Sequence, residues 1–209
     1  MNKIKIVNEL IKNNNQSEIL KDKLKKEEVA KYLFEVFKDQ IEENTAYYHL
    51  VLSEEQYNSL DKDIDWRIFG DILISVRYFG ELEFIHYFDL CNMESIKEKG
   101  LLVSYSQKKE DDYRPDMGYG IYVIWGDDAY EMPDNLAETL LNRYDGENEE
   151  IGFVVGVYNG EYLEAVNTYH HSGYYVLKSD VTLDMIKEID SEHISGLAED
   201  YYDYLSWEF

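Results

Sequence analysis

Short runs of β-branched and aromatic residues recur along the chain after residue 68 and restrict the folds open to it. They span residues 69–76, 82–88, 121–125, 151–158, 162–166 and 174–177. Runs of this length and composition are typical of strands that are buried on at least one face. Asn159 and Gly160 separate two of the runs and predict the tight turn of a β-hairpin. We therefore expect a sheet of several short strands.

The first 40 residues show a helical pattern instead. Apolar residues recur at intervals of three and four at Ile4, Val7, Leu10 and Ile11, and again at Val29, Leu33, Val36 and Phe37. A run of asparagines separates the two stretches, and Ser17 is the expected N-cap of the second helical piece.

Further helices are expected to be short. They fall at residues 92–99, 134–144 and 184–189. Gly100 fits the C-cap of the first of them. Helices that come first and strands that follow predict an α+β fold. We expect a mostly helical region at residues 1–80 and a sheet domain at residues 81–209 that ends in an acidic tail.

The charge of the chain limits its partners. The 44 Asp and Glu residues outnumber the 20 Lys and Arg residues and give a formal net charge of −24. Residues 41–209 carry 37 of the acidic and 11 of the basic side chains. Such a surface repels nucleic acids and anionic membranes, so we expect direct binding to neither. It attracts a basic protein and steers its approach, although plain solubility is an equal interpretation.

The acidic tail has two interpretations of its own. Residues 196–209, GLAEDYYDYLSWEF, combine carboxylates with Tyr, Trp and Phe. The segment either anchors a protein interface or forms a helix that packs Tyr202, Leu205 and Phe209 on the body.

Cysteine and histidine usage argues against disulfides and metals. Cys91 is the single cysteine, so disulfides within the chain and cysteine-based zinc sites are excluded. His170 and His171 would point to opposite faces of a strand, so no metal site is expected.

No apolar run approaches the roughly 18 residues of a membrane helix, and the first residues lack the apolar stretch of a signal peptide. We expect a cytoplasmic protein.

Two motifs follow one another in the middle of the chain. They are HYFDLCNMESIKEKGLLVSYSQ at residues 86–107 and GYGIYVIWGDDAY at residues 118–130. A strand ending in His, a helix ending in Gly-Leu and a Gly-x-Gly-Ile-Tyr strand resemble the NAD-binding half of the ADP-ribosyltransferase fold. The similarity is to the branch of diphtheria toxin and the poly(ADP-ribose) polymerases, over about residues 82–190. It implies a split antiparallel β-sheet core with short helices.

The resemblance also implies a ligand and its contacts. NAD would be the substrate, and ADP-ribose would be transferred to a macromolecular target. His86 would hydrogen-bond a ribose hydroxyl and hold NAD bent. Tyr122 would form one face of the nicotinamide slot, and Tyr130 would form the other by stacking. Gly120 would let the strand pass close to the nicotinamide ring.

The family's catalytic glutamate has no counterpart here, because Gly173 occupies the matching position. In the family this carboxylate stabilises the positive charge that develops as nicotinamide leaves. Glu161 and Glu164 are the candidate replacements, and Glu164 joins His86 and Tyr122 in the expected catalytic set. The alternatives are that both glutamates are solvated strand charges, or that the histidines before the last strand assist the reaction.

Two functions from different classes stay open. In the first, the protein is an ADP-ribosyltransferase-like enzyme that binds NAD and modifies a macromolecular target. In the second, it is a catalytically inactive acidic inhibitor that binds a basic nucleic-acid-binding protein. Such an inhibitor would be an immunity factor, an anti-CRISPR or another phage counter-defence protein.

Overall fold

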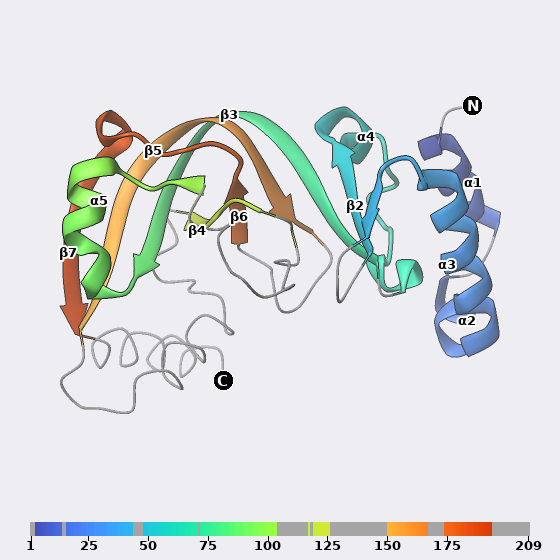
Figure 1. The fold of residues 1–209 in the computed structure, drawn as a ribbon. Coiled ribbons are helices and arrows are strands. Elements are labelled where there is room, and N and C mark those ends of the chain that lie inside the picture. Colours follow the sequence, from blue (N-terminus) through green and yellow to red (C-terminus); the bar gives the residue numbers. More distant parts are fainter. Residues whose placement is uncertain are drawn as a thin grey trace.

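The computed structural model describes residues 3–13, 16–43, 48–70, 72–103, 117, 119–125, 150–166 and 174–193. These residues form a mixed α/β fold with few helices and one seven-stranded mixed sheet. In spatial order its strands are β1 (Ile41–Glu43), β2 (Tyr48–Ser53), β3 (Ile72–Phe88), β4 (Ile121–Trp125), β6 (Tyr174–Leu177), β5 (Glu150–Ala165) and β7 (Ile186–His193). β3 and β5 form an arch between a helical end and a sheet-rich end (Figure 1).

The helices are short and lie mostly at the N-terminal end. They are α1 (Lys3–Asn13), α2 (Gln16–Lys21), α3 (Lys23–Phe37), α4 (Glu54–Asn58) and α5 (Met93–Lys99), with 3-10 turns η1 (Trp66–Phe69), η2 (Leu90–Asn92) and η3 (Leu183–Met185). None of the described helices combines the length and apolar character that a membrane span requires.

The N-terminal helical pattern is confirmed, with one correction. Ile4, Val7 and Ile11 of α1 are buried, as are Leu33 and Phe37 of α3, because the apolar positions fall on one face of each helix. The expected cap at Ser17 is wrong, since this residue lies inside α2. Asp22 caps α3 instead and accepts hydrogen bonds from the backbone N–H groups of residues 24 and 25.

The expected hairpin at Asn159 and Gly160 is wrong. β5 runs straight through both residues and pairs antiparallel with β3 from Ser75↔Ala165 to Phe88↔Gly152. The expected strands at 69–76 and 82–88 are likewise one strand, so the border drawn at residue 80 lies inside β3. Gly80 pairs with Gly160 in this ribbon.

Packing explains why this Asn-Gly pair does not turn. A hairpin of that type needs φ > 0 at both residues, and among the described residues only Gly70, Gly80 and Gly100 have positive φ. Gly160 instead leaves room for the ring of Tyr158, because an added Cβ would lie 2.6 Å from the Tyr158 hydroxyl oxygen. The Tyr158 hydroxyl donates to the Glu161 carbonyl oxygen at 3.0 Å, which holds the ring in place.

The middle strands close a ring. β3 pairs with β4, β4 with β6, β6 with β5, and β5 with β3, all antiparallel. β2 lies in the region that was expected to be mostly helical and is parallel to β3, which makes the whole sheet mixed. The described pairings among β3, β4, β5, β6 and β7 are antiparallel. The strands expected at 121–125 and 174–177 are confirmed as β4 and β6.

The C-terminal part of the described fold holds a confirmed helix and a wrong one. α5 forms where a helix was expected, and Gly100 ends it with φ +75°. The helix expected at residues 184–189 is the turn η3 followed by strand β7. A register shift in the β5–β7 ladder lets both Ile186 and Ile189 pack on the core, so a strand here imitates the three-residue spacing of a helix.

The core is divided along the arch. One cluster joins α1 and α3 to β2 and the start of β3, and a second joins α5 to the far parts of β3 and β5. The expected helix at 134–144, the tail at 196–209, Tyr130, Gly173, His170 and His171 lie outside the described residues.

Candidate functional site

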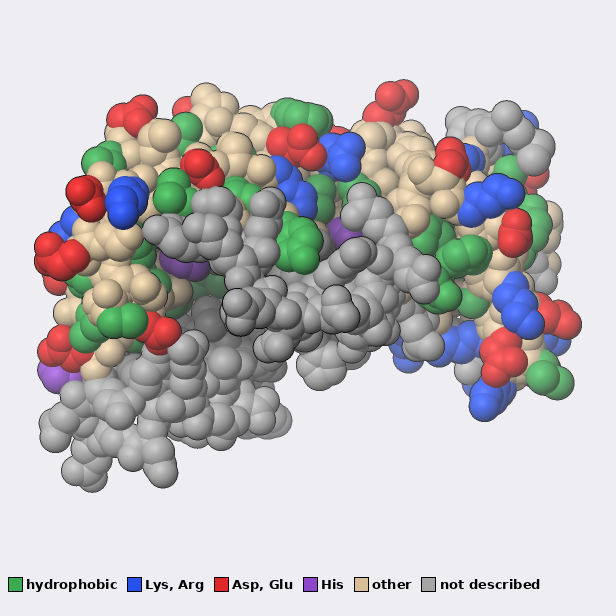
Figure 2. All heavy atoms as spheres, in the orientation of Figure 1, with side chains coloured by type: hydrophobic (Ala, Val, Ile, Leu, Met, Phe, Trp, Pro, Cys, Tyr) green, Lys and Arg blue, Asp and Glu red, His purple; other side chains and the backbone are tan. Residues whose placement is uncertain are grey.

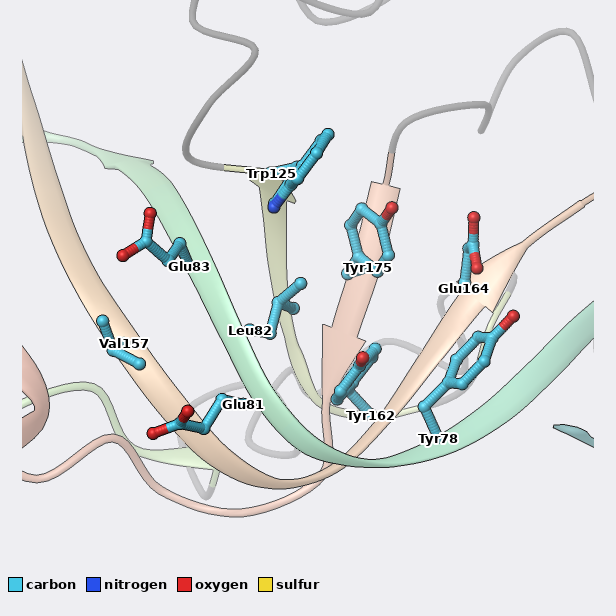
Figure 3. A pocket seen from close by; sticks show the side chains of 9 residues that line it. All are labelled: Tyr78, Glu81, Leu82, Glu83, Trp125, Val157, Tyr162, Glu164 and Tyr175. Atoms are coloured by element: carbon cyan, nitrogen blue, oxygen red, sulfur yellow. The ribbon is translucent and has the colours of Figure 1, made fainter.

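A cavity of about 460 Å³ is lined from all four strands of the ring. Its lining residues are Tyr78, Glu81, Leu82 and Glu83 of β3, Trp125 of β4, Val157, Tyr162 and Glu164 of β5, and Tyr175 of β6 (Figure 3). Aromatic and acidic side chains make up most of this lining, and we call it the aromatic–acidic cavity. Strand register assembles it, since Tyr78 pairs with Tyr162 and Glu164 pairs with Tyr175.

Glu164 is the half-buried carboxylate of the cavity. Its carboxylate accepts hydrogen bonds from the hydroxyl groups of Tyr78 and Tyr175. Burial raises the pKa of Glu164, and the two hydrogen bonds act in the opposite direction. Among the described residues no salt bridge includes Glu164. The cavity therefore offers a negative group whose hydration is reduced, and a cation would restore the lost stabilisation.

The aromatic rings surround this carboxylate. The rings of Tyr78 and Tyr162 stack with centroids 5.5 Å apart, and those of Tyr162 and Tyr175 meet edge to face at 6.0 Å. Trp125 stands beside Tyr175 and is 41% exposed (Figure 3). Burial first, and the charge of Glu164 second, raise the pKa of the Tyr78 hydroxyl, so this hydroxyl stays a donor to Glu164 at neutral pH.

Acidic side chains continue from the cavity across one face of the sheet. Residues opposite each other in a ladder share a face, and residues two apart on a strand do too. The pairs Glu83↔Val157, Val155↔Glu188 and Phe153↔Asp190 therefore place Glu81, Glu83, Glu188 and Asp190 together. We call these residues the acidic face. Lys187 crosses it and pairs with Glu83 at 2.8 Å.

Positive charge gathers elsewhere. Figure 2 shows acidic side chains over the sheet-rich end and several Lys and Arg side chains over the helical end. This agrees with the charge of the first 40 residues, which hold nine basic and seven acidic side chains. Glu81 and Glu83 border the aromatic–acidic cavity where it meets β3. Strand alternation turns their side chains to the sheet face opposite Tyr78 and Tyr162, so the acidic face and the cavity adjoin along β3.

His86 lies on β3 near the sheet-rich end. Its Nδ1–H donates a hydrogen bond of 2.8 Å to the carbonyl oxygen of Tyr122. Burial lowers the pKa of His86, and this backbone hydrogen bond opposes the effect. The contact ties β3 to β4, where the backbone ladder between the two strands ends.

Tyr122 and Gly120 have packing roles in the described structure. The Tyr122 hydroxyl accepts a hydrogen bond from the backbone N–H of Met117 at 3.0 Å. The ladder pair Ile85↔Ile124 puts Tyr122 and His86 on opposite faces of the sheet. At Gly120 an added Cβ would lie 2.2 Å from Cγ1 of Val176, so the glycine allows β6 to approach closely.

The three expected catalytic residues are not brought together. Glu164 is opposite Val76, and His86 lies ten residues further along β3, about 33 Å of extended strand. His86 and Tyr122 face different sides of the sheet. His86 and Glu164 therefore lie on different stretches of the arch, and the NAD contacts expected of these residues stay a prediction.

Sequence reasoning missed the tyrosines that surround Glu164. Tyr78, Tyr162 and Tyr175 stand on three strands, and only the register of the ladders makes them neighbours. It also missed a buried pair, His49 and Ser75, whose Nε2 and Oγ atoms are 2.5 Å apart. His49 is opposite Leu73, two residues from Ser75, so strand alternation puts both side chains on one face of the sheet. The sequence shows this only if β2 and β3 are known to be adjacent.

Neither a metal-ligand cluster among the described residues nor a similar known protein assigns a function to the site. Among the described residues no three His, Cys, Asp or Glu side chains are grouped to hold a metal ion. No family model, curated protein or solved structure matches the chain.

Proposed function

We propose that this protein binds a basic protein through the acidic face and the adjoining aromatic–acidic cavity. The observation that carries the proposal is that the two adjoin along β3: Glu81 and Glu83 border the cavity and turn their side chains to the acidic face. Carboxylates on the outside attract and orient a cationic surface, and aromatic rings inside supply an anchor.

The chemistry of the partner follows from the charge. Net charge of −24 opposes binding to nucleic acids and favours a protein whose own surface is basic. A nucleic-acid-binding protein has such a surface where it contacts phosphates. A carboxylate-covered sheet face occupies that surface in place of the nucleic acid, so the proposed activity is inhibition by occlusion.

A charge-matched comparison tests the proposal. A synthetic peptide rich in Arg and Lys is titrated with the protein by calorimetry, at low salt and at roughly 0.5 M salt. The double variant E188Q/D190N removes two charges from the acidic face but leaves the cavity lining unchanged. We expect it to weaken binding about fivefold at low salt, since each lost charge pair contributes some tenths of a kcal/mol.

The matched control removes two charges elsewhere. The double variant E18Q/E28Q changes exposed residues of α2 and α3 and alters the net charge by the same amount. We expect less than a twofold effect from it. Equal losses in the two double variants would mean that the peptide responds to total charge alone, and the proposal would be wrong.

An ADP-ribosyltransferase-like core that uses NAD stays a separate prediction. Its direct test is a calorimetric titration with NAD in which nicotinamide release is followed in the same sample. Heat of binding that H86A and Y122A both abolish would support the prediction. Absence of binding at millimolar NAD would remove it and leave the basic-protein proposal unaffected.

A further inference from the structure

We propose that the aromatic–acidic cavity receives a guanidinium group, so that the anchoring side chain of the partner is an arginine. The inference rests on the proposed function, because it names the group that the partner inserts. It follows from two features of the cavity: the remaining hydrogen-bonding capacity of Glu164 and the aromatic faces beside it.

Glu164 retains acceptor sites after its internal hydrogen bonds are made. An ionised carboxylate has two oxygens and about four lone-pair sites. The hydroxyl groups of Tyr78 and Tyr175 each use one of them. The sites that are left suit a donor that presents two N–H groups side by side, and guanidinium is the side-chain cation with that geometry.

The aromatic lining favours a flat cation. Guanidinium is planar, weakly hydrated and stacks on aromatic faces, whereas ammonium is compact and strongly hydrated. Tyr175 holds Glu164 through its hydroxyl, and Trp125 stands next to Tyr175 on the adjoining strand (Figure 3). A guanidinium bound in the plane of the Glu164 carboxylate would thus have aromatic faces beside it and cation–π stabilisation in addition to the ion pair.

The carboxylate of Glu164 distinguishes arginine from a quaternary ammonium ion. Cages for quaternary ammonium need aromatic rings but no hydrogen-bond acceptor, because that ion has no N–H donor. Here the carboxylate of Glu164 lies beside the rings of Tyr78 and Tyr175 (Figure 3). Glu81 and Glu83 turn their side chains to the other face of β3, so Glu164 is the carboxylate that the incoming cation meets.

Small-molecule probes test the inference without a partner protein. N-acetyl-arginine amide, N-acetyl-lysine amide and tetramethylammonium are titrated at constant ionic strength, and the indole N–H signal of Trp125 is followed by NMR. Comparison with W125F assigns this signal among those of the three tryptophans. We expect arginine amide to bind in the millimolar range, about tenfold more tightly than either of the other cations.

Two variants locate the bound group. E164Q should abolish the arginine-induced shift, and Y175F, which keeps the ring and removes a hydroxyl held by Glu164, should weaken binding about threefold. E28Q on α3 is the control with unchanged binding. Thermal unfolding of each variant shows whether it is folded. If E164Q does not fold, the binding measured with Y175F still decides the test.

The outcomes separate the inference from the proposed function. Equal binding of the three cations, or arginine binding that persists in E164Q, would overturn the arginine assignment. In that case E188Q/D190N would still report on the basic-protein proposal, since these residues do not line the cavity. Arginine selectivity without any effect of E188Q/D190N on the basic peptide would support the cavity and overturn the acidic face.

Discussion

At the scale of single residues, His49 is the clearest link between burial and stability. It lies on β2, is 2% exposed and is hydrogen-bonded to Ser75. Burial lowers the pKa of His49 from 6.5 to about 4, and the positive charges of Lys178 and Arg77 act in the same direction. His49 is therefore neutral in the folded protein at neutral pH.

The free energy of unfolding should fall with acidification because of this histidine. The unfolded chain binds a proton near pH 6.5 and the folded chain near pH 4, so the neutral form stabilises the fold above pH 6.5. Between pH 7 and pH 5 we expect a loss of about 2 kcal/mol from His49. Urea unfolding of wild type and H49Q at both pH values measures it.

Comparison of wild type with H49Q also controls for the other groups that titrate between pH 5 and pH 7. Carboxylates titrate in both proteins, so only the difference between the two pH profiles reports on His49. H49Q is expected to have the flatter profile between pH 5 and pH 7. Parallel profiles would show that His49 does not contribute in this range.

At the scale of elements, the continuity of β5 through Asn159 and Gly160 can be tested by substitution. If β5 is one continuous strand, G160A should lower the free energy of unfolding by about 1–3 kcal/mol, because the added Cβ meets the buried ring of Tyr158. N159A should cost less than about 0.5 kcal/mol, because Asn159 is exposed. Thermal or urea unfolding gives both values.

A hairpin at the same place would give another result. Both residues would then need φ > 0, and N159A would destabilise the protein as G160A does. A large effect of N159A therefore contradicts a continuous β5, and a small effect of both substitutions contradicts the packing of Tyr158 on Gly160.

The elements that the sequence predicts well are those defined by local pattern. α1, α3, α5, β4 and β6 each follow from spacing or composition within a few residues. The helix expected at residues 184–189 is wrong, because Ile186 and Ile189 pack on the core from a strand, and the register shift that brings both to one face depends on β5. The hairpin at Asn159 failed for a similar reason, since β3 supplies the ladder that keeps β5 extended.

The site depended even more on distant parts of the chain. Glu164 was named from the sequence, but its partners Tyr78 and Tyr175 lie on β3 and β6, and no local pattern links them. His86 was expected to bind a ribose of NAD and Tyr122 its nicotinamide, and the Ile85↔Ile124 pairing puts their side chains on opposite faces of the sheet. Register is a property of ladders, so sequence reasoning about sites across strands fails where the register is unknown.

At the scale of the whole molecule, the arch has a consequence for modularity. β3 contributes Ile72 and Ile74 to the core of the helical end and Leu82, Phe84 and Phe88 to the core of the sheet-rich end. A cut at residue 80 would divide one strand between two fragments and leave each half of β5 without part of its ladder. The helical end is therefore not a separate folding unit, and the two ends have to be transferred to another protein or redesigned together.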